Sequence, residues 1–288
     1  MSLQTLVPVV LKASVLLNVF AIGLRASAQD ATYLFRRPGE LIRAIFAMNV
    51  LMPAFALVLV SVIDLTPAVK IALVALSVSP IPPLLPKKLV KAGGTGSYAM
   101  GLLIAAGLLA IIFVPLAMEV IERVRHVPLQ MTVVSIAALI FMTVVLPLGL
   151  GVAVHSLAPG RAERLAKPIS QIAGIGLLAC VVTILIAAAP IIWTLVDSGT
   201  LIALAAFVVV GLAIGHVLGG PTPENRTALA ISTASRHPGI AIAIAQTNFP
   251  EQKLALAAVI LYLVVNALIS ITYNAWTQRA DRRRGSIP

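Results

Sequence analysis

The stretch Ser79-Pro80-Ile81-Pro82-Pro83 interrupts one long apolar run, and Ser235-Arg236-His237-Pro238-Gly239 interrupts another much later in the chain. Proline removes a backbone donor and clashes with the preceding turn, so each stretch breaks a helix where a bilayer would otherwise require a continuous one. Such backbone survives at membrane depth only where protein buries it or where it lines a wet cavity. We call residues 79–83 the first break and residues 235–239 the second break. One break in each half of a membrane protein is typical of secondary transporters.

The composition indicates a membrane protein. Hydrophobic residues make up 60% of the chain and charged residues 11%, with a mean hydropathy of +1.04, whereas soluble domains carry roughly 25% charged residues. The net charge of +11 does not indicate nucleic acid, because the cations sit in short loops without interleaved aromatic residues. The single Cys180 argues against a disulfide framework or a thiolate metal site. We find no catalytic motif and expect no enzyme, no metal and no cofactor.

The apolar pattern predicts an all-α polytopic protein with about nine transmembrane helices. Each spanning helix needs about 20 mostly apolar residues. The third and eighth segments carry the two breaks. The nine segments cover residues 3–24, 41–63, 67–85, 98–120, 129–154, 169–195, 201–218, 227–246 and 254–276.

The distribution of Lys and Arg predicts the orientation. With nine spans, fifteen of the 21 basic residues fall on one side, four on the other and two within spans. Because basic loops stay in the cytoplasm, we expect an inner (plasma) membrane protein with its N-terminus outside and its C-terminus inside. The positions of the breaks suggest two inverted repeats of four and five helices, the first repeat lacking its opening helix.

Arg236 is the strongest candidate for a functional residue. It lies near the middle of its span, where a charge costs at least ~2.5–3.5 kcal/mol. It could bind a substrate or take part in coupling; alternatively, it could be a structural residue that holds carbonyls freed by Pro238, or the partner of a carboxylate.

Further candidates surround the two breaks or are amides inside spans. The hydroxyls could bind a ligand or bond back to the preceding turn, the prolines could line a cavity or only kink a helix, and the amides could bind substrate or a neighbouring helix. The substrate-binding candidates besides Arg236 are His237, Ser235, Ser232, Thr233, Pro238, Gly239, Ser79, Pro80, Pro82, Pro83, Asn18, Asn49 and Asn266.

Three glycines recur every fourth residue along residues 201–218 and just beyond, at Gly211, Gly215 and Gly219. Small residues at this spacing let two helices approach closely, so we interpret the stripe as a packing surface. His216 lies beside it, and we expect a hydrogen-bonded contact between helices there.

Several segments resemble the bile acid:sodium symporter family. They are residues 17–24 (Leu-Asn-Val-Phe-Ala-Ile-Gly-Leu), residues 34–38 with 51–53, and Asn225-Arg226-Thr227-Ala228-Leu229-Ala230 leading to Gly239. The resemblance implies a core domain, in which two broken helices cross, and a smaller panel domain. It divides the chain into a panel at 1–30, a core at 31–127, a panel at 128–196 and a core at 197–288.

The resemblance also implies where this chain departs from the family. The family's sodium-binding Glu and Gln align with Ser232 and Arg236, and the neighbouring Asn aligns with His237. Oxygen ligands from the first broken helix and the helix after it align with Leu85, Pro86, Ala99 and Leu103. A fixed cation therefore replaces the ligands that sodium would need.

These observations predict a secondary transporter that moves an organic anion, a carboxylate or a bile-acid-like molecule, by alternating access without Na⁺. An alternative is a Na⁺-coupled symporter, and a second is a membrane sensor or binding protein on the same fold. The expected partners are the lipid bilayer, a small organic anion and either H⁺ or Na⁺, but not nucleic acid. The sequence leaves the substrate, the coupling ion and the oligomeric state open.

Overall fold

The computed structural model describes residues 3–82, 85, 96–125 and 132–285, and within these residues every regular element is helical. Two of the elements are π-helical and are labelled η. In chain order the elements are α1 (Leu3–Gly23), α2 (Ala28–Thr32), α3 (Pro38–Ile45), η1 (Phe46–Leu51), α4 (Met52–Val62), α5 (Pro67–Val78), α7 (Gly96–Arg125), α8 (Val133–Ile140), η2 (Phe141–Val145), α9 (Leu146–Leu157), α10 (Pro159–Leu195), α11 (Ser198–Leu218), α12 (Pro223–Ala234), α13 (Pro238–Asn248) and α14 (Leu254–Gly285).

Seven helices in the described part of the chain are long and apolar enough to cross a membrane. They correspond to seven of the nine expected spans, so the protein is a multi-pass helical membrane protein. The other two expected spans are the ones that carry the breaks: α5 ends at Val78, and the eighth is divided into α12 and α13. The total of nine spans and the inverted repeat stay predictions.

Two expected spans contain a feature that the apolar pattern did not predict. In α3–η1–α4 and in α8–η2–α9 the helix widens to π geometry a few residues before a proline, Pro53 or Pro147. The amide of Met52 donates to the carbonyl of Ala47, and that of Leu146 donates to the carbonyl of Phe141, each five residues back. Because proline has no N–H, each shift leaves a carbonyl without its helical donor.

The glycine stripe is a packing surface, as predicted. A Cβ added at Gly215 would lie 2.5 Å from the Cα of Ala230, and one added at Gly211 would lie 2.9 Å from the Cα of Ala234. Gly219 meets the backbone of Arg226 in the same way. These glycines let α11 lie directly against α12, which leads into the second break.

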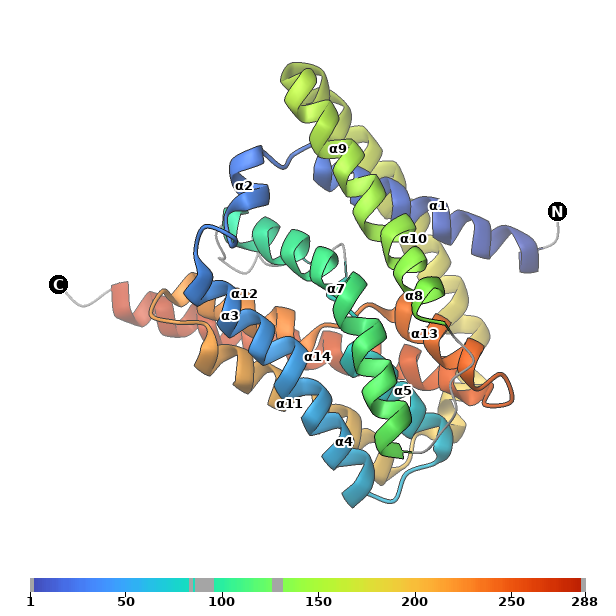
Figure 1. Cartoon of the computed structure of the whole chain (residues 1–288). Coiled ribbons are helices and arrows are strands. Elements are labelled where there is room, and N and C mark those ends of the chain that lie inside the picture. Colours follow the sequence, from blue (N-terminus) through green and yellow to red (C-terminus); the bar gives the residue numbers. More distant parts are fainter. Residues whose placement is uncertain (1–2, 83–84, 86–95, 126–131, 286–288) are drawn as a thin grey trace.

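The helices form two groups (Figure 1). In one, α1 packs against α9 and α10; in the other, α12, α13 and α14 pack with α5, α7 and α11. A large apolar core lies mainly in the second group and extends to α8 and to residues of the first group such as Ile22 and Leu148; α7 packs against α8 and η2. Helix α1 thus lies with α9 and α10, and the division into panel and core stays a prediction.

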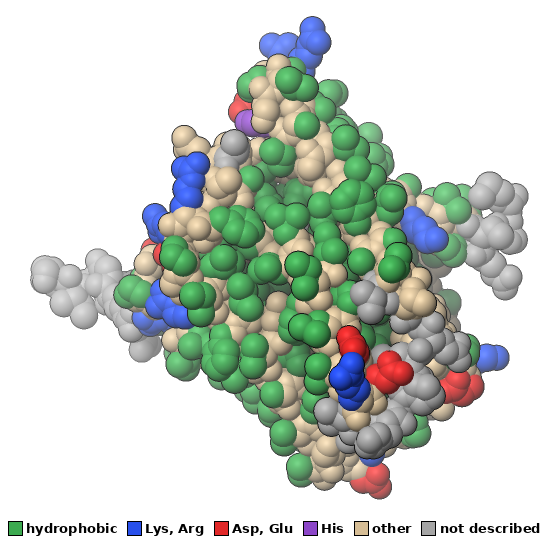
Figure 2. Space-filling view, in the orientation of Figure 1, with side chains coloured by type: hydrophobic (Ala, Val, Ile, Leu, Met, Phe, Trp, Pro, Cys, Tyr) green, Lys and Arg blue, Asp and Glu red, His purple; other side chains and the backbone are tan. Residues whose placement is uncertain are grey.

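Hydrophobic side chains cover most of the face that Figure 2 shows; charged side chains lie mainly at its margins, with one mixed cluster at the lower right. Helix α10, which lies behind α8 and α9 in this view, also exposes apolar side chains: Ile175 is 70% exposed and Ile186 71% exposed. Large apolar surfaces of this extent are uncommon on soluble monomers. In a bilayer these side chains contact lipid.

Candidate functional site

Each break contains a residue that a following proline holds out of helical geometry. The residue before a proline is pushed into the extended region. Ser79 precedes Pro80 and has φ −69° and ψ 143°; His237 precedes Pro238 and has φ −75° and ψ 105°. The carbonyls and amides of these segments therefore point away from their own helices and need other partners.

The two breaks lie against each other. The amide of His237 donates to the carbonyl of Pro80 at 2.8 Å, and Nη1 of Arg236 donates to the carbonyl of Ser79 at 3.2 Å. The expectation that segments 157 residues apart meet at one point is confirmed. Both bonds run from the second break to the first.

A third element, η1, contributes to the same point. Nη2 of Arg236 donates to the carbonyl of Met48 at 2.8 Å. This carbonyl is available because the amide of Met52 bonds to Ala47 and the next residue is Pro53, which has no amide hydrogen. The π segment therefore turns a helical carbonyl into a ligand for the guanidinium.

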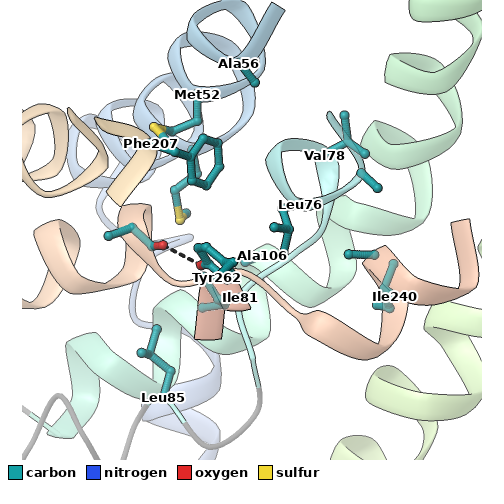
Figure 3. Packing of buried hydrophobic residues seen from close by; sticks show 14 of the residues in the cluster. Met52, Ala56, Leu76, Val78, Ile81, Leu85, Ala106, Phe207, Ile240 and Tyr262 are labelled. Carbon is teal, nitrogen blue, oxygen red and sulfur yellow. Dashed lines mark hydrogen bonds between the residues drawn. The ribbon is translucent and has the colours of Figure 1, made fainter. Parts of the chain in front are cut away.

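Helix α14 holds the second break from its other side. The hydroxyl of Tyr262 accepts from the amide of Arg236 at 2.8 Å and donates to the carbonyl of Ala234 at 2.6 Å. One turn further along, Nδ2 of Asn266 donates to Oγ of Ser235 at 3.4 Å. Figure 3 shows Tyr262 inside the apolar core, with the dashed line at its hydroxyl and Phe207 close to its ring. These contacts hold Ser235 and Arg236 outside the helix that ends at Ala234.

Arg236 is 2% exposed, and all of its described side-chain partners are carbonyl oxygens. The two ion pairs among the described residues, Arg37–Glu40 and Glu119–Arg123, do not involve it. Its Nε atom is buried without a hydrogen bond. Arg236 therefore binds freed carbonyls, but they are those of Ser79 and Met48 and not the ones expected from Pro238. Its contact with a substrate stays a prediction.

His237 caps the N-terminus of α13. Its Nδ1 accepts from the amide of Ile240 at 3.4 Å, so the proton of the neutral ring lies on Nε2. Nε2 is buried without a partner. The adjacent Gly239 is exposed, and a Cβ added there would lie 3.2 Å from Cε1 of the ring. One edge of the imidazole thus lies beside an exposed glycine at the start of α13.

Apart from Ser235, which contacts Asn266, the hydroxyl candidates bond back to their own helices. Ser232 donates to the carbonyl of Ala228 and Thr233 to that of Leu229, both at 2.8 Å, and Ser79 donates to that of Ala75 at 2.7 Å. This is the alternative of back-bonding to the preceding turn, and it leaves only acceptor capacity on these oxygens.

We call the place where the two breaks meet the crossing. The amide candidates do not all lie there. Asn266 does, through Ser235, and Asn49 lies half-buried in η1 beside Met48. Asn18 is fully buried in α1, where it donates to the carbonyl of Ser14, and α1 packs mainly against α9 and α10. Pro80 is buried and Pro82 and Pro238 are half-buried, while Pro83 lies outside the described residues.

Two residues of the site were missed from sequence: Met48, which acts through its carbonyl, and Tyr262. Pro53, five residues after Met48, was the available signal for the first. Nothing in the pattern around Tyr262 distinguishes it from a core residue. No cluster of three His, Cys, Asp or Glu side chains that could hold a metal occurs in the part of the chain that the structure describes.

The fold and the site define a class: a polytopic helical membrane protein in which two interrupted helices meet in the apolar core. The model of the sodium bile acid symporter family matches residues 13–195. This range is more than half of the chain, so the protein belongs to that family, which is a family of transporters. The match includes the first break and ends before the second. No curated protein matches the chain.

Proposed function

We propose that this protein is a secondary transporter of an organic anion, a carboxylate or a bile-acid-like molecule, and that it works without Na⁺. The observation that carries the proposal is the buried guanidinium of Arg236, which bonds to carbonyls of Ser79 and Met48 and has no described carboxylate partner. A guanidinium remains charged at any physiological pH. The crossing therefore contains a permanent positive charge.

This charge opposes a sodium ion at the same place. Backbone carbonyls are hard oxygen ligands that a cation would use, and here Arg236 occupies two of them. A Na⁺ ion about 4 Å from the guanidinium would be repelled by roughly 4 kcal/mol at an effective dielectric constant of about 20. Ser232, in the position that resembles the family's acidic ligand, supplies no negative charge.

An anion has a suitable place at the start of α13. A helix N-terminus carries a partial positive charge. At α13 proline removes the first amide and Nδ1 of His237 occupies that of Ile240, so the amide of Gly239 is the one left for a ligand. The ring whose Cε1 lies beside exposed Gly239 also carries the unpartnered Nε2–H, and Arg236 directly precedes this histidine in the chain. We expect the charged head of the substrate to bind here, with H⁺ as a secondary possibility for coupling through His237.

Transport would occur by alternating access, with α1 and α8–α10 rocking as a panel against the remaining helices. The protein would lie in the inner (plasma) membrane with its C-terminus in the cytoplasm. Reporter fusions after Trp276 and in the loop at residues 161–167 should both report cytoplasm.

The test is counterflow of labelled carboxylates and bile acids in liposomes, in Na⁺ and in choline, for the wild type and Arg236→Gln. We expect equal wild-type affinity in the two salts and at least a tenfold loss in the variant. Arg123→Gln, an exposed arginine paired with Glu119, is the control and should behave as wild type.

The other outcomes separate the alternatives. A strong Na⁺ requirement in the wild type would favour a coupled symporter and contradict Na⁺ independence. Binding without counterflow would favour a sensor or binding protein. Unchanged affinity in Arg236→Gln would show that the charge does not act on the anion.

A further inference from the structure

The turn between α11 and α12 places two guanidiniums on one glycine. Nε and Nη2 of Arg226 donate to the carbonyl of Gly220 at 3.2 and 3.1 Å. The guanidinium of Arg43, from α3, covers the other side of the same residue: a Cβ added to Gly220 would lie 3.1 Å from its Nη1 and 3.2 Å from its Nη2. Gly220 has φ +83°, so glycine suits both the turn and the close approach.

These two charges are not neutralised by the described ion pairs. Glu40, one turn before Arg43 on α3, pairs with Arg37 at 3.2 Å. Arg43 uses Nε for the carbonyl of Gly39. Its two Nη groups, which face Gly220, have no hydrogen bond among the described contacts. The pair is therefore a concentrated positive site on a half-buried surface. Nε and Nη2 of Arg226 are used by the carbonyls of Gly220 and Pro221, so Arg43 supplies the two Nη donors that bidentate phosphate recognition uses.

Exposed apolar side chains lie near the pair in the chain, together with the exposed polar residues Thr222 and Glu224 at the start of α12. Ile42, next to Arg43, is 64% exposed, and Val217, three residues before Gly220, is 79% exposed. Figure 2 shows Lys and Arg side chains along the edge near the ends of α2, α3 and α12, bordering continuous hydrophobic surface. A ligand with a phosphate head and apolar tails would satisfy both surfaces, whereas free phosphate would satisfy only one.

We propose that the phosphate of an anionic membrane lipid binds between Arg43 and Arg226 at this turn. The orientation expected from the basic residues places the turn at the cytoplasmic leaflet, where anionic lipids accumulate. The bound phosphate connects α3 to the start of α12, and it thereby fixes the end of the helix that leads to the second break. This site is separate from the crossing and does not depend on what the protein transports.

The experiment measures lipid retention by native mass spectrometry and thermal unfolding in mixed micelles that contain phosphatidylglycerol or phosphatidylcholine, with inorganic phosphate as a third condition. We expect wild type to retain phosphatidylglycerol and to unfold at a higher temperature with it than in the other two conditions. Arg43→Gln should lower phosphatidylglycerol retention about tenfold, and Arg43→Lys should retain an intermediate amount because it keeps the charge but loses the planar fork.

Arg161→Gln is the matched control, because it removes an exposed basic residue on the same expected side of the membrane. If it reduces retention as much as Arg43→Gln, binding is not specific to the turn and the proposal is wrong. Unchanged retention in Arg43→Gln overturns it as well. Equal stabilisation by inorganic phosphate would show that the source is soluble phosphate and would overturn the lipid assignment. Because lipid retention is measured on folded protein, a loss of stability alone would not mimic the expected result.

Discussion

The two breaks meet, but they contribute opposite chemistry. The first break contributes acceptors: its contacts with the second run through the carbonyls of Ser79 and Pro80, and its prolines have no amide hydrogen. The second contributes donors, the amide of His237 and the guanidinium of Arg236. A proline-rich break is therefore complementary to a break that carries Arg and an amide.

Because one break supplies acceptors and the other supplies donors, we expect each break to need the other for its hydrogen bonds. Unpaired backbone groups are costly in lipid, so the carbonyls of one break need donors that the other supplies. The acceptor side extends to Met48, where Pro53 frees a further carbonyl for Arg236. The second break, which supplies the donors, is held in place by Tyr262. Its hydroxyl bonds to the carbonyl of Ala234, the last residue of α12, and to the amide of Arg236.

Tyr262→Phe tests whether the donor side needs this support, and we expect the largest change of stability here. It removes two buried hydrogen bonds and leaves the amide of Arg236 and the carbonyl of Ala234 unpaired, at about 1–3 kcal/mol for a buried unsatisfied group. Thermal unfolding in detergent measures the loss. Tyr273→Phe, which removes the 2.6 Å hydrogen bond with Nδ1 of half-exposed His216, should cost less. Equal effects would contradict a special role for Tyr262.

Pro53→Ala tests the acceptor side. An amide at residue 53 allows the helix to take back the carbonyl of Met48, so Arg236 loses one partner. In a double-mutant cycle, Arg236→Gln should lower the free energy of unfolding less in the Pro53→Ala background than in the wild type. The expected coupling energy is about 0.5–2 kcal/mol.

Pro147→Ala is the matched control for this cycle. It follows the other π segment, η2, in a helix that supplies no described ligand to Arg236. Its effect should add to that of Arg236→Gln within about 0.5 kcal/mol. Coupling of similar size in both backgrounds would mean that the Met48 carbonyl has no particular part in holding the guanidinium.

The features that sequence predicted are those set by residue identity. The breaks follow from proline, the spans from apolar length, and the contact of α11 with α12 from glycines four residues apart. The His216 contact between helices is also confirmed, because a polar ring in an apolar span needs a partner and finds Tyr273.

The features that escaped prediction depend on hydrogen-bond register or on packing. The carbonyl of Met48 became a ligand because η1 shifts its bonds by one residue, and any side chain at position 48 would offer the same oxygen. Tyr262 looked like a core aromatic until its hydroxyl could be placed. Asn18 carries the same amide as Asn266, yet it lies in α1 rather than at the crossing, because packing of whole helices decides which amide reaches the site.

Asp197→Ala should change the free energy of unfolding least. The side chain of Asp197 is exposed, whereas the hydrogen bonds at the crossing are buried. Asp197 caps α11: Oδ1 accepts from the amide of Thr200 at 2.6 Å and Oδ2 from its hydroxyl at 2.9 Å. Such caps contribute about 1 kcal/mol or less at an exposed position. Asp197→Asn is the control, because its amide oxygen can still cap the helix.

The pH dependence of the stability difference between wild type and Asp197→Ala tests whether the ionised carboxylate caps α11. The hydrogen bond from the Thr200 amide, with that from the hydroxyl, holds the pKa of Asp197 below its ordinary value of 3.8. The folded state thus binds the proton less well than the unfolded state, and the stabilisation is complete above about pH 3.8 and declines as the pH falls through the lower folded pKa. Wild type and Asp197→Ala should therefore differ equally at pH 5 and pH 7 and converge below pH 3.8. A difference between them that grows on acidification would contradict this assignment, and a cost larger than that of Tyr262→Phe would reverse the ranking of water-exposed and buried contacts.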